Sequence, residues 1–553
     1  MTYDAIVVGG GHNGLTTAAY LGRAGLRVLV LERRAILGGA AVTEEFHPGY
    51  RNSIASYTVS LLRPEVIADL ELESHGYETI AHKGSLYMFS EGEPMLLTGD
   101  ETHDRMVYGR HSNRDYDATI QFYKTVARVG EVLRAQWLKE PPPLSGGAFD
   151  LTRLLPAGRA FRKLSAEDRH FLMQLFTSSA TSLAERWFES ERVRNEFLGH
   201  CVSSNFASLE APGSAVPLFQ NALGEFQGRR GSWGLAKGGM GAITQAMAKS
   251  GAEYDVEFRC EAPVARILVD SGQSIGVRLE NGEELRSRIV VANTDPKRTF
   301  LKMVGREHLP DHFADDIAHL RYGHASLRMN LALAGMPEFA SLNAEENIIA
   351  RASALYIYPS RAEIQAGYRA ACDGYIHEAP YVNMLIPSSQ DHSLAPQGHH
   401  VMSLLCKYFP YRLADGRDWK QIKERVADAV VRRVARHIPN LPDLIVARQV
   451  LSPLDLEEVF GLTEGDIFHG RHDLDQIFSL RPHPDAAQYR TPIGNLYLCG
   501  SGTHPGGGVS GAPGRNAAMR IIADLGVQRT VGWKRLRRVK LSQRHSRTIP
   551  DGA

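Results

Sequence analysis

Three glycines with a fixed spacing lie near the start of the chain. In "DAIVVGGGHNGLTTAAY", Gly9, Gly11 and Gly14 separate an apolar run from a run of small residues. Gly9 permits a tight turn, Gly11 lets the backbone approach a pyrophosphate, and Gly14 lets a helix pack closely on a strand. Glu32 follows a second apolar run, where a carboxylate can accept a hydrogen bond from a ribose hydroxyl. These residues predict a dinucleotide site.

The elements that must position these residues are a strand, a turn, a helix and a second strand within residues 4–32. NAD and FAD share the ADP half that this unit recognises. The next residues, "ERRAILGGAAV", place Arg33, the doublet Gly38-Gly39 and Ala40 beyond the acid. A simple NAD-binding unit does not need that doublet. It resembles the doublet of glutathione-reductase-like flavoproteins, and the sequence therefore favours FAD.

A second glycine-rich stretch, "NLYLCGSGTHPGGGVSGAPGRNAA", occupies residues 495–518. It follows a predicted strand at 495–499 and leads into a predicted helix that begins near Gly511. Gly500 and Ser501 can present backbone N–H groups to the ribityl chain, and the run that ends at Gly508 can cross the flavin face. The positive end of the helix can stabilise negative charge on a reduced flavin ring.

A third segment, residues 236–296, contains a predicted helix, a hairpin at Asn281-Gly282 and the strand "RIVVAN". In flavoproteins that it resembles, backbone at the position of Val264 reads the adenine edge. No second strand-GxGxxG-helix unit occurs mid-chain, which argues against a separate NAD(P)H domain. The residues expected to hold the cofactor are Gly9, Gly11, His12, Asn13, Gly14, Glu32, Arg33, Gly39, Ala40, Val264, Gly500, Ser501, Gly508, Ser510 and Gly511.

Composition limits the other possibilities. The 553 residues are 43% hydrophobic, and 63 Lys+Arg nearly balance 62 Asp+Glu, so nothing indicates a nucleic-acid partner. The five cysteines lack metal-like spacing and suggest buried thiols in a reducing compartment, and the histidines lack ligand partners, so we expect no metal site. No apolar run is long enough to span a membrane, and strand-like residues begin at once. We expect a cytoplasmic protein.

Several stretches together carry a family resemblance. They are "RNSIASYTVSLLRPEVIADLEL" (51–72), "GSWGLAKGGMGAITQAMA" (231–248), "SPLDLEEVFGLTEGDIFHG" (452–470) and "QIFSLRPH" (476–483). With the C-terminal glycine motif they resemble FAD oxidoreductases of the phytoene desaturase and carotenoid isomerase type, in the branch of pyridine nucleotide-disulfide oxidoreductase domain-containing protein 2. The resemblance covers residues 3–525. No close cysteine pair supports disulfide chemistry.

The resemblance implies non-covalent FAD and hydride transfer at flavin N5, in desaturation, dehydrogenation or isomerisation of a hydrophobic, polyene or lipid-like substrate. Residues 356–360, 384–388 and 407–413 are candidates to line an apolar tunnel, or are ordinary strands with turn prolines. Arg481 and His504 are candidate catalytic residues beside the cavity. Each has a structural alternative, a salt bridge for Arg481 and a backbone hydrogen bond for His504.

The fold implied is α/β, with a glutathione-reductase-like Rossmann domain for FAD and an interleaved α+β substrate domain. We expect residues 1–52, 230–300 and 480–528 in the FAD domain, 53–229 and 301–479 in the substrate domain, and 529–553 as a basic tail. Two other functions remain open. One is a non-catalytic lipid- or partner-binding protein on the same fold, and the other is an amine or amino-acid oxidase. The acid that many amine-oxidase relatives place near the ribityl chain is absent at Gly500-Ser501.

The basic tail includes "GWKRLRRVKLSQRHSR" (532–547), in which seven Lys/Arg surround Trp533 and three aliphatic residues. As a helix it would present a narrow apolar stripe beside basic residues, which suits peripheral contact with an anionic membrane. A solvated tail that lies on the more acidic remainder of the protein is the alternative. The oligomeric state is left open.

Overall fold

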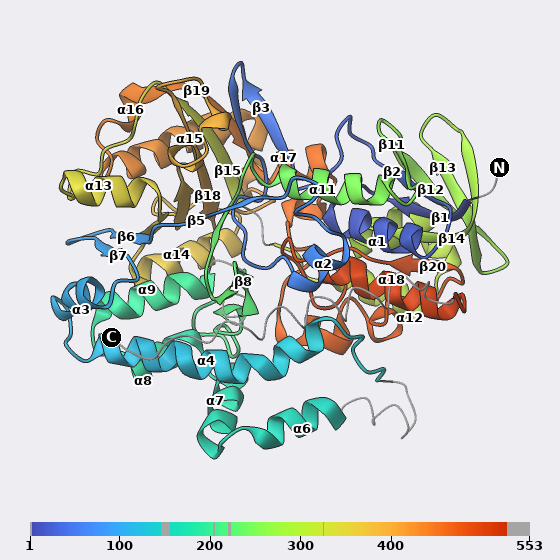
Figure 1. Ribbon diagram of the computed structural model, residues 1–553, viewed down its shortest axis with the longest axis horizontal. Coiled ribbons are helices and arrows are strands. Elements are labelled where there is room, and N and C mark those ends of the chain that lie inside the picture. Colours follow the sequence, from blue (N-terminus) through green and yellow to red (C-terminus); the bar gives the residue numbers. More distant parts are fainter. Residues whose placement is uncertain (1–2, 145–154, 203–204, 219–222, 324–325, 528–553) are drawn as a thin grey trace.

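The computed structural model describes residues 3–144, 155–202, 205–218, 223–323 and 326–527. Two large sheets organise it, and Figure 1 shows them side by side, with the first and last strands of the chain in the same sheet. The basic segment 532–547 lies outside the described residues. No described helix is long and apolar enough to cross a membrane, and no described group of His, Cys, Asp or Glu could hold a metal ion.

The first sheet has the order β11-β2-β1-β14-β13-β12, with β20 also paired to β14. The pairings of β11, β2, β1, β14 and β20 are parallel, whereas β12 and β13 form an antiparallel meander with β14. The strands are β1 (Tyr3–Val8), β2 (Val28–Leu31), β11 (Glu257–Arg259), β12 (Val264–Asp270), β13 (Gln273–Leu279), β14 (Glu284–Ala292) and β20 (Leu496–Leu498).

Apolar side chains on both faces hold this sheet in place. Residues Ala5 to Val8 of β1 and all of β2 are buried, as expected for parallel strands that are covered on two sides. One face packs against α1 (His12–Arg23), α11 (Gly241–Ala252) and α18 (Ala512–Asp524). The other packs against the π-helical turn at 298–304 and α12 (Asp311–His319).

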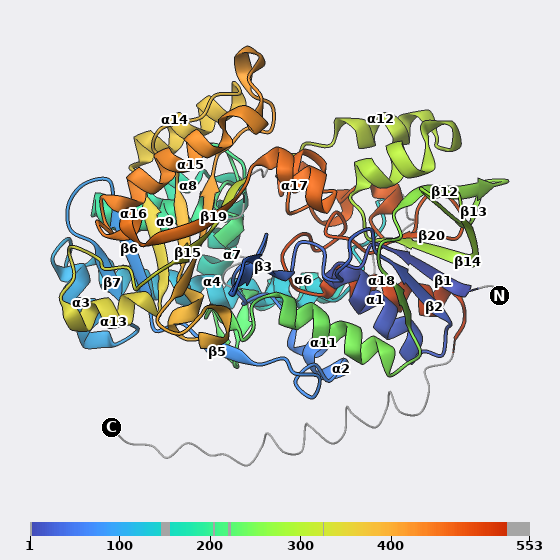
Figure 2. The same cartoon turned by 90° about the horizontal axis from the view of Figure 1, so that it is seen from above.

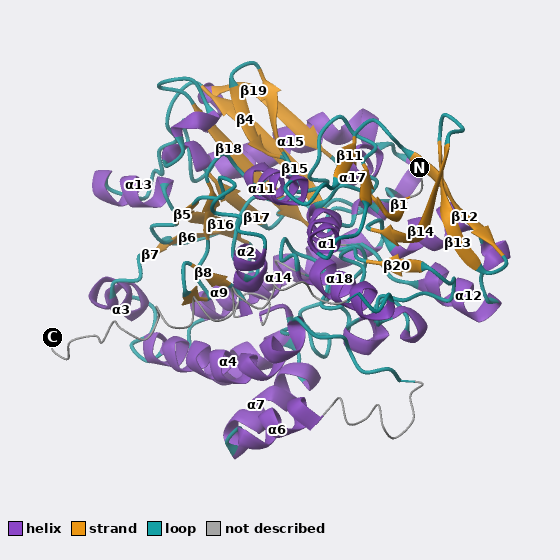
Figure 3. Ribbon diagram, turned by 45° about the vertical axis from the view of Figure 1, so that its right-hand side comes forward, coloured by secondary structure: helices purple, strands orange, loops and turns teal. Residues whose placement is uncertain are grey.

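The second sheet has the order β19-β15-β18-β17-β16-β6-β7. One face packs on α15 (Trp419–Ala435) and α13 (Ala344–Arg351). The other packs on α4 (Asp115–Trp137), α7 (Ala166–Thr177), α8 (Ala180–Trp187), α9 (Glu191–Val202) and α14 (Arg361–Cys372). Figure 3 shows α13 and α15 beside the strands, with α4, α7, α9 and α14 below them. The strands are β6 (Ser85–Phe89), β7 (Met95–Leu97), β15 (Ser326–Leu333), β16 (Ala354–Tyr358), β17 (Val382–Leu385), β18 (His400–Lys407) and β19 (Ile445–Leu451).

Helices between β7 and β10 cover one side of the second sheet. They are α3 (Glu101–Gly109), α4 (Asp115–Trp137), α6 (Leu155–Lys163), α7 (Ala166–Thr177), α8 (Ala180–Trp187) and α9 (Glu191–Val202). Two-stranded pairs lie outside the two large sheets, and in the view of Figure 2 one of their strands, β5 (Thr79–Ala81), is drawn below the second sheet. The remaining elements are β3 (Thr43–His47), β4 (Tyr50–Ser53), α2 (Pro64–Asp69), β5 (Thr79–Ala81), β8 (Glu225–Phe226), β9 (Arg229–Arg230), β10 (Gly234–Ala236), α16 (Leu441–Leu444) and α17 (Pro453–Phe460).

The result is a mixed α/β fold with a Rossmann-like cofactor domain. The three predicted FAD segments supply the strands of the first sheet. The exact domain boundaries stay a prediction, and two segments cross them. Residues 301–319 pack on the first sheet, whereas the hairpin β3–β4 contacts the second sheet through β18 and β19. The expectation of buried thiols fails at Cys372, which is exposed on α14.

Candidate functional site

The turn after β1 has the close packing that its glycines predict. Gly9 has φ +99°, a conformation that favours glycine, and its N–H donates to the Leu31 carbonyl at 2.8 Å. A Cβ on Gly14 would lie 2.2 Å from the Gly9 carbonyl oxygen. The amide of Asn293, at the end of β14, donates to the same oxygen at 3.1 Å. The sequence reasoning missed Asn293, although its place after "RIVVA" was a signal.

Two neighbouring charged residues of the predicted site have different surroundings. The buried Glu32 carboxylate, directly after β2, accepts hydrogen bonds from the backbone N–H groups of Gly10 and Arg34, each at 2.9 Å. It therefore fixes the turn, and its predicted hydrogen bond to a ribose stays a prediction. Arg33 is exposed, and its guanidinium donates to the carbonyls of Glu458 and Val459 in α17. These contacts give Arg33 a bridging role, and its predicted contact with the cofactor stays a prediction.

The glycine doublet touches the first turn, backbone against backbone. The Gly38 N–H donates to the Gly10 carbonyl at 2.8 Å, and Gly38 forms an isolated bridge with Gly11. Gly39 has φ +56°, and a Cβ there would lie 3.0 Å from the Gly11 Cα. The two segments therefore form a surface that is free of side chains, with Ala40 next to it.

The C-terminal loop closes over the same turn from the other end of the chain. Nε2 of His12 lies 3.1 Å from the Gly508 carbonyl oxygen, and the Asn13 amide donates to the Ser501 hydroxyl at 3.3 Å. Gly511, with φ +68°, is the N-cap of α18. The N–H of Ala512, the first residue of α18, donates to the Ser510 hydroxyl at 3.2 Å.

The positions of these residues fit FAD. Gly11 is the N-cap of α1 and makes no side-chain cap bond, so N–H groups of the first turn are available for a pyrophosphate. Oδ1 of Asn13 is buried without a hydrogen-bond partner among the described residues. Burial lowers the pKa of His12 to about 4, so this imidazole is neutral at pH 7. Val264 begins β12, and Gly500 lies two residues beyond the end of β20; both strands lie at edges of the sheet that carries the turn.

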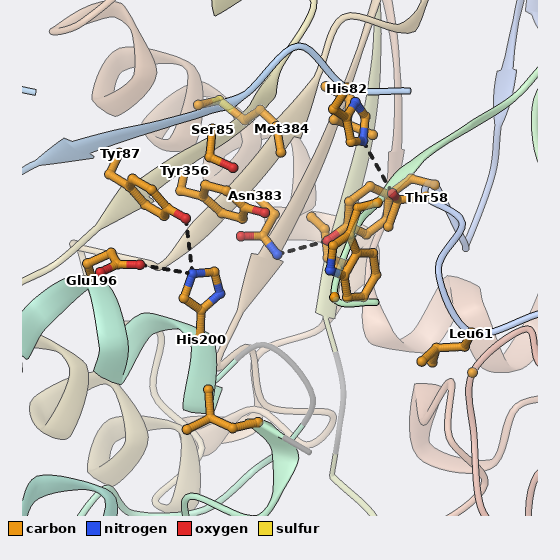
Figure 4. Close-up of a pocket in the computed structure, with 18 of the residues that line it drawn as sticks. Thr58, Leu61, His82, Ser85, Tyr87, Glu196, His200, Tyr356, Asn383 and Met384 are labelled. Carbon is orange, nitrogen blue, oxygen red and sulfur yellow. Dashed lines mark hydrogen bonds and ion pairs between the residues drawn. The ribbon is translucent and has the colours of Figure 1, made fainter. Parts of the chain in front are cut away.

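The first turn, the glycine doublet and the C-terminal loop together form what we call the cofactor cradle. One cavity of about 600 Å³ runs from this cradle into the half of the molecule that contains the second sheet (Figure 4). At the cradle it is lined by His12, Ala40, Ala41, Gly508 and Val509. Ile120 and Tyr123 of α4 line it too and are 40% and 39% exposed, which indicates an opening beside this helix. The three stretches predicted to line a tunnel contribute Tyr356, Met384, Leu385 and Lys407, and this prediction is confirmed for them.

Arg481 and His504 are not where the sequence placed them. Neither lines the cavity. The buried Arg481 guanidinium donates to the backbone carbonyls of Ser501, Arg471, Gln476, Phe468 and Gly470. Nε2 of His504 lies 3.2 Å from the Gln136 carbonyl oxygen, and burial lowers its pKa to about 4. Arg481 holds loops together, and His504 ties its loop to the end of α4, so the prediction that they border the cavity is wrong, and their catalytic role stays a prediction.

Other polar residues line the cavity instead: Lys407 of a predicted lining stretch, and Glu196 and His200, which the sequence reasoning missed. Lys407, at the end of β18, is buried, and burial lowers its pKa to about 7 against the opposing effect of the Asp466 charge. Glu196 and His200 lie one helical turn apart on α9. Their spacing in "NEFLGH" was a signal for an acid–histidine pair, but the sequence could not tell which face of the helix borders a cavity.

Comparisons with known proteins match two segments of the chain to families and most of its length to relatives. Residues 7–67 match the NAD(P)-binding Rossmann-like domain, and residues 113–326 match the flavin containing amine oxidoreductase family. Pyridine nucleotide-disulfide oxidoreductase domain-containing protein 2 of Rattus norvegicus is 37% identical, covering 95% of this chain and 94% of that protein. A limonene dehydrogenase component of Castellaniella defragrans is 26% identical, covering 95% of each.

More distant relatives share the fold. Phytoene desaturase of Cercospora nicotianae is 26% identical, covering 96% of this chain and 90% of that protein. A solved structure of a putrescine oxidase triple mutant superposes with a TM-score of 0.60 at 15% identity, covering 95% and 98% of the chains. The glycine cradle and these matches together support FAD as the cofactor. The chain therefore belongs to the family of pyridine nucleotide-disulfide oxidoreductase domain-containing protein 2, among the FAD oxidoreductases related to flavin containing amine oxidases.

Proposed function

We propose that the protein dehydrogenates or isomerises a hydrophobic substrate with non-covalently bound FAD. The observation that carries the proposal is the cavity that joins the cofactor cradle to the second sheet. Where it meets the cradle its wall includes Ala40, Ala41, Leu61, Phe468 and Val509, none of which bears a charge. A carbon skeleton in this part would be shielded from water beside the cofactor.

Removal of two hydrogens from adjacent carbons releases a hydride equivalent and a proton. Bound FAD would supply the acceptor for the hydride. Lys407 lines the same cavity, and with a pKa of about 7 its amine is neutral in a large fraction of molecules at neutral pH. We infer that this amine accepts the proton, because a base with a pKa near the working pH transfers protons efficiently. In an isomerisation, the same group would return the proton.

The names of two relatives support the choice of substrate class. The limonene dehydrogenase component and phytoene desaturase both align over more than nine-tenths of this chain, and both are named for hydrocarbons. An amine oxidase is the rival. The likeness to putrescine oxidase is below 25% identity and supports the fold alone.

The test uses the purified full chain. Acid precipitation should release all the yellow colour; flavin that stays in the pellet would contradict the non-covalent part. The protein is then mixed without oxygen with limonene, phytoene, putrescine or cyclohexylamine, and bleaching of the flavin's visible band is recorded. We expect bleaching by a hydrocarbon and none by the amines, with a slower rate in Lys407→Met. Bleaching by the amines, with peroxide formed when air is admitted, would establish the rival. Protein purified without any flavin would favour the non-catalytic alternative.

A further inference from the structure

A buried acid–histidine pair lines the cavity away from the cofactor cradle. Glu196 is 4% exposed, and its Oε1 lies 3.4 Å from Nε2 of His200. Figure 4 shows this pair on the opposite side of the view from Leu61. Leu61 marks the cradle end, because its side chain packs beside Gly508, where an added Cβ would lie 2.6 Å from the leucine Cδ1. One cavity therefore has a cofactor end and an acid end.

Tyrosines surround the acid end. The Tyr87 hydroxyl lies 3.1 Å from Nε2 of His200, and the Tyr108 hydroxyl donates to Oε2 of Glu196 at 3.4 Å. The rings of Tyr87 and Tyr356 stack with centroids 5.1 Å apart. Burial, with the Glu196 charge as the next cause, raises the pKa of Tyr87 and Tyr108 well above 10, so both phenols stay neutral. The tyrosines that line this part are Tyr87, Tyr108, Tyr116, Tyr123 and Tyr356.

The carboxylate lacks a permanent positive partner within this group. Among the described residues, no lysine or arginine forms an ion pair with Glu196, and its one ion-pair partner is His200. A buried carboxylate is costly unless a cation or several hydrogen-bond donors compensate it. The two contacts to Glu196, both at 3.4 Å, are long for hydrogen bonds to a charged group. Neutral aromatic rings around an acid form a recognised environment for an ammonium group.

We propose that the acid end binds a protonated amine carried by the substrate, so that the natural substrate joins the apolar skeleton of the proposed function to a cationic head group. The proposal rests on the proposed function and extends it. The ammonium would lie against Glu196 while the apolar part reaches Leu61 and the cofactor. The carbon that reacts would then belong to the apolar part of the substrate, and the amine group would be the same in substrate and product. This separates the proposal from amine oxidation, in which the carbon next to the nitrogen loses hydride.

The experiment measures binding, so it does not depend on turnover. The FAD-bound full chain is titrated calorimetrically with decylamine, 1-decanol and decanoate, which share a chain length and differ in head-group charge. We expect decylammonium to bind more tightly than decanol, and decanoate to bind most weakly. In Glu196→Gln the ammonium should lose about 30-fold or more in affinity, because loss of one partner of a buried charge pair costs at least about 2 kcal/mol. Decanol should be little affected.

Glu191→Gln is the matched control, because Glu191 is an exposed acid at the start of the same helix, paired with Arg194. It should leave all three affinities unchanged. Equal loss for decylamine and decanol in Glu196→Gln, or unaltered decylamine binding, would overturn the proposal. If Glu196→Gln does not retain FAD, the three affinities of the unaltered protein decide. Decanol or decanoate that binds as tightly as decylammonium would refute the cation site.

The two proposals can fail separately. Bleaching of the flavin by uncharged hydrocarbons, with no preference for decylammonium in binding, would support the proposed function and overturn the cation site. Tight, Glu196-dependent binding of decylammonium without oxidation of any hydrophobic compound would support the site and overturn the proposed function.

Discussion

Substitution of Gly14 by alanine tests the packing of the cofactor cradle, because the added Cβ would clash with atoms of the turn itself. The new Cβ would lie 2.2 Å from the Gly9 carbonyl oxygen and 3.0 Å from the Asn293 amide nitrogen, whereas ordinary contact begins at 3.4 Å. The carbonyl belongs to the turn whose N–H groups are predicted to bind the pyrophosphate, and the Asn293 amide donates to it. Helix α1 and this turn must therefore separate by roughly 1 Å.

Overpacking of this kind costs about 1–3 kcal/mol, which corresponds to a loss of roughly 5-fold to 150-fold in FAD affinity if the whole cost lowers that affinity. The assay is the ratio of flavin to protein after purification, followed by titration of the stripped protein with FAD. Gly158→Ala is the control, since this exposed glycine in α6 has no heavy atom within 4 Å of the added carbon. Its helix should gain up to about 1 kcal/mol. Unchanged FAD affinity and thermal midpoint in Gly14→Ala would refute the packing argument.

Three further predictions concern groups away from that turn. The folded pKa of Lys407, about 7, lies below its ordinary value of 10.5, so the folded state binds fewer protons between these values and the free energy of unfolding rises with pH. Thermal melts from pH 7 to 10 should show that rise diminished in Lys407→Met; equal slopes would contradict the buried amine. Arg481→Met should lower the free energy of unfolding by at least about 2 kcal/mol, because buried carbonyls lose their donor, while turnover per bound FAD stays near that of the unaltered protein. Strong loss of turnover in folded, FAD-bound Arg481→Met would restore its predicted catalytic role. Deletion of residues 530–553 should abolish cosedimentation with anionic vesicles, and salt should weaken it in the full chain, since each basic residue contributes roughly 1 kcal/mol; no binding by the full chain would end the idea of membrane contact.

The cofactor half of the site was predictable because its requirements are local. A tight turn, a close backbone approach and a helix start each need a glycine at one position, and Gly9, Gly39 and Gly511 have the positive φ that such turns favour. Three such segments, far apart in the sequence, point to the same ligand. We could therefore predict that the three segments meet on one sheet, because a single FAD needs all of them, although no single motif indicates this.

The substrate half was less predictable because side-chain direction there depends on distant packing. Arg481 lies close in sequence to the glycine motif and His504 lies within it, yet both side chains form hydrogen bonds to backbone carbonyls. Glu196 and His200 border the cavity because the opposite face of α9 packs among aromatic residues of α4 and α8. An amphipathic pattern predicts that a helix has two faces, but only the tertiary fold decides that one of them meets a cavity.

The cofactor cradle uses both ends of the described chain, and this has a consequence for biosynthesis. Strand β20 completes the sheet that β1 begins, and the Thr17 hydroxyl of α1 donates to the Gly514 carbonyl of α18 across 497 positions. A nascent chain cannot close this cradle until residues 496–524 have left the ribosome, so FAD capture must be a late event in folding. Until then the C-terminal part of one edge of β14, Val290–Ala292, is unpaired and open to misassociation. A premature stop that removes only the last tenth of the protein would therefore leave the nucleotide-binding motif intact in sequence but unable to retain its cofactor.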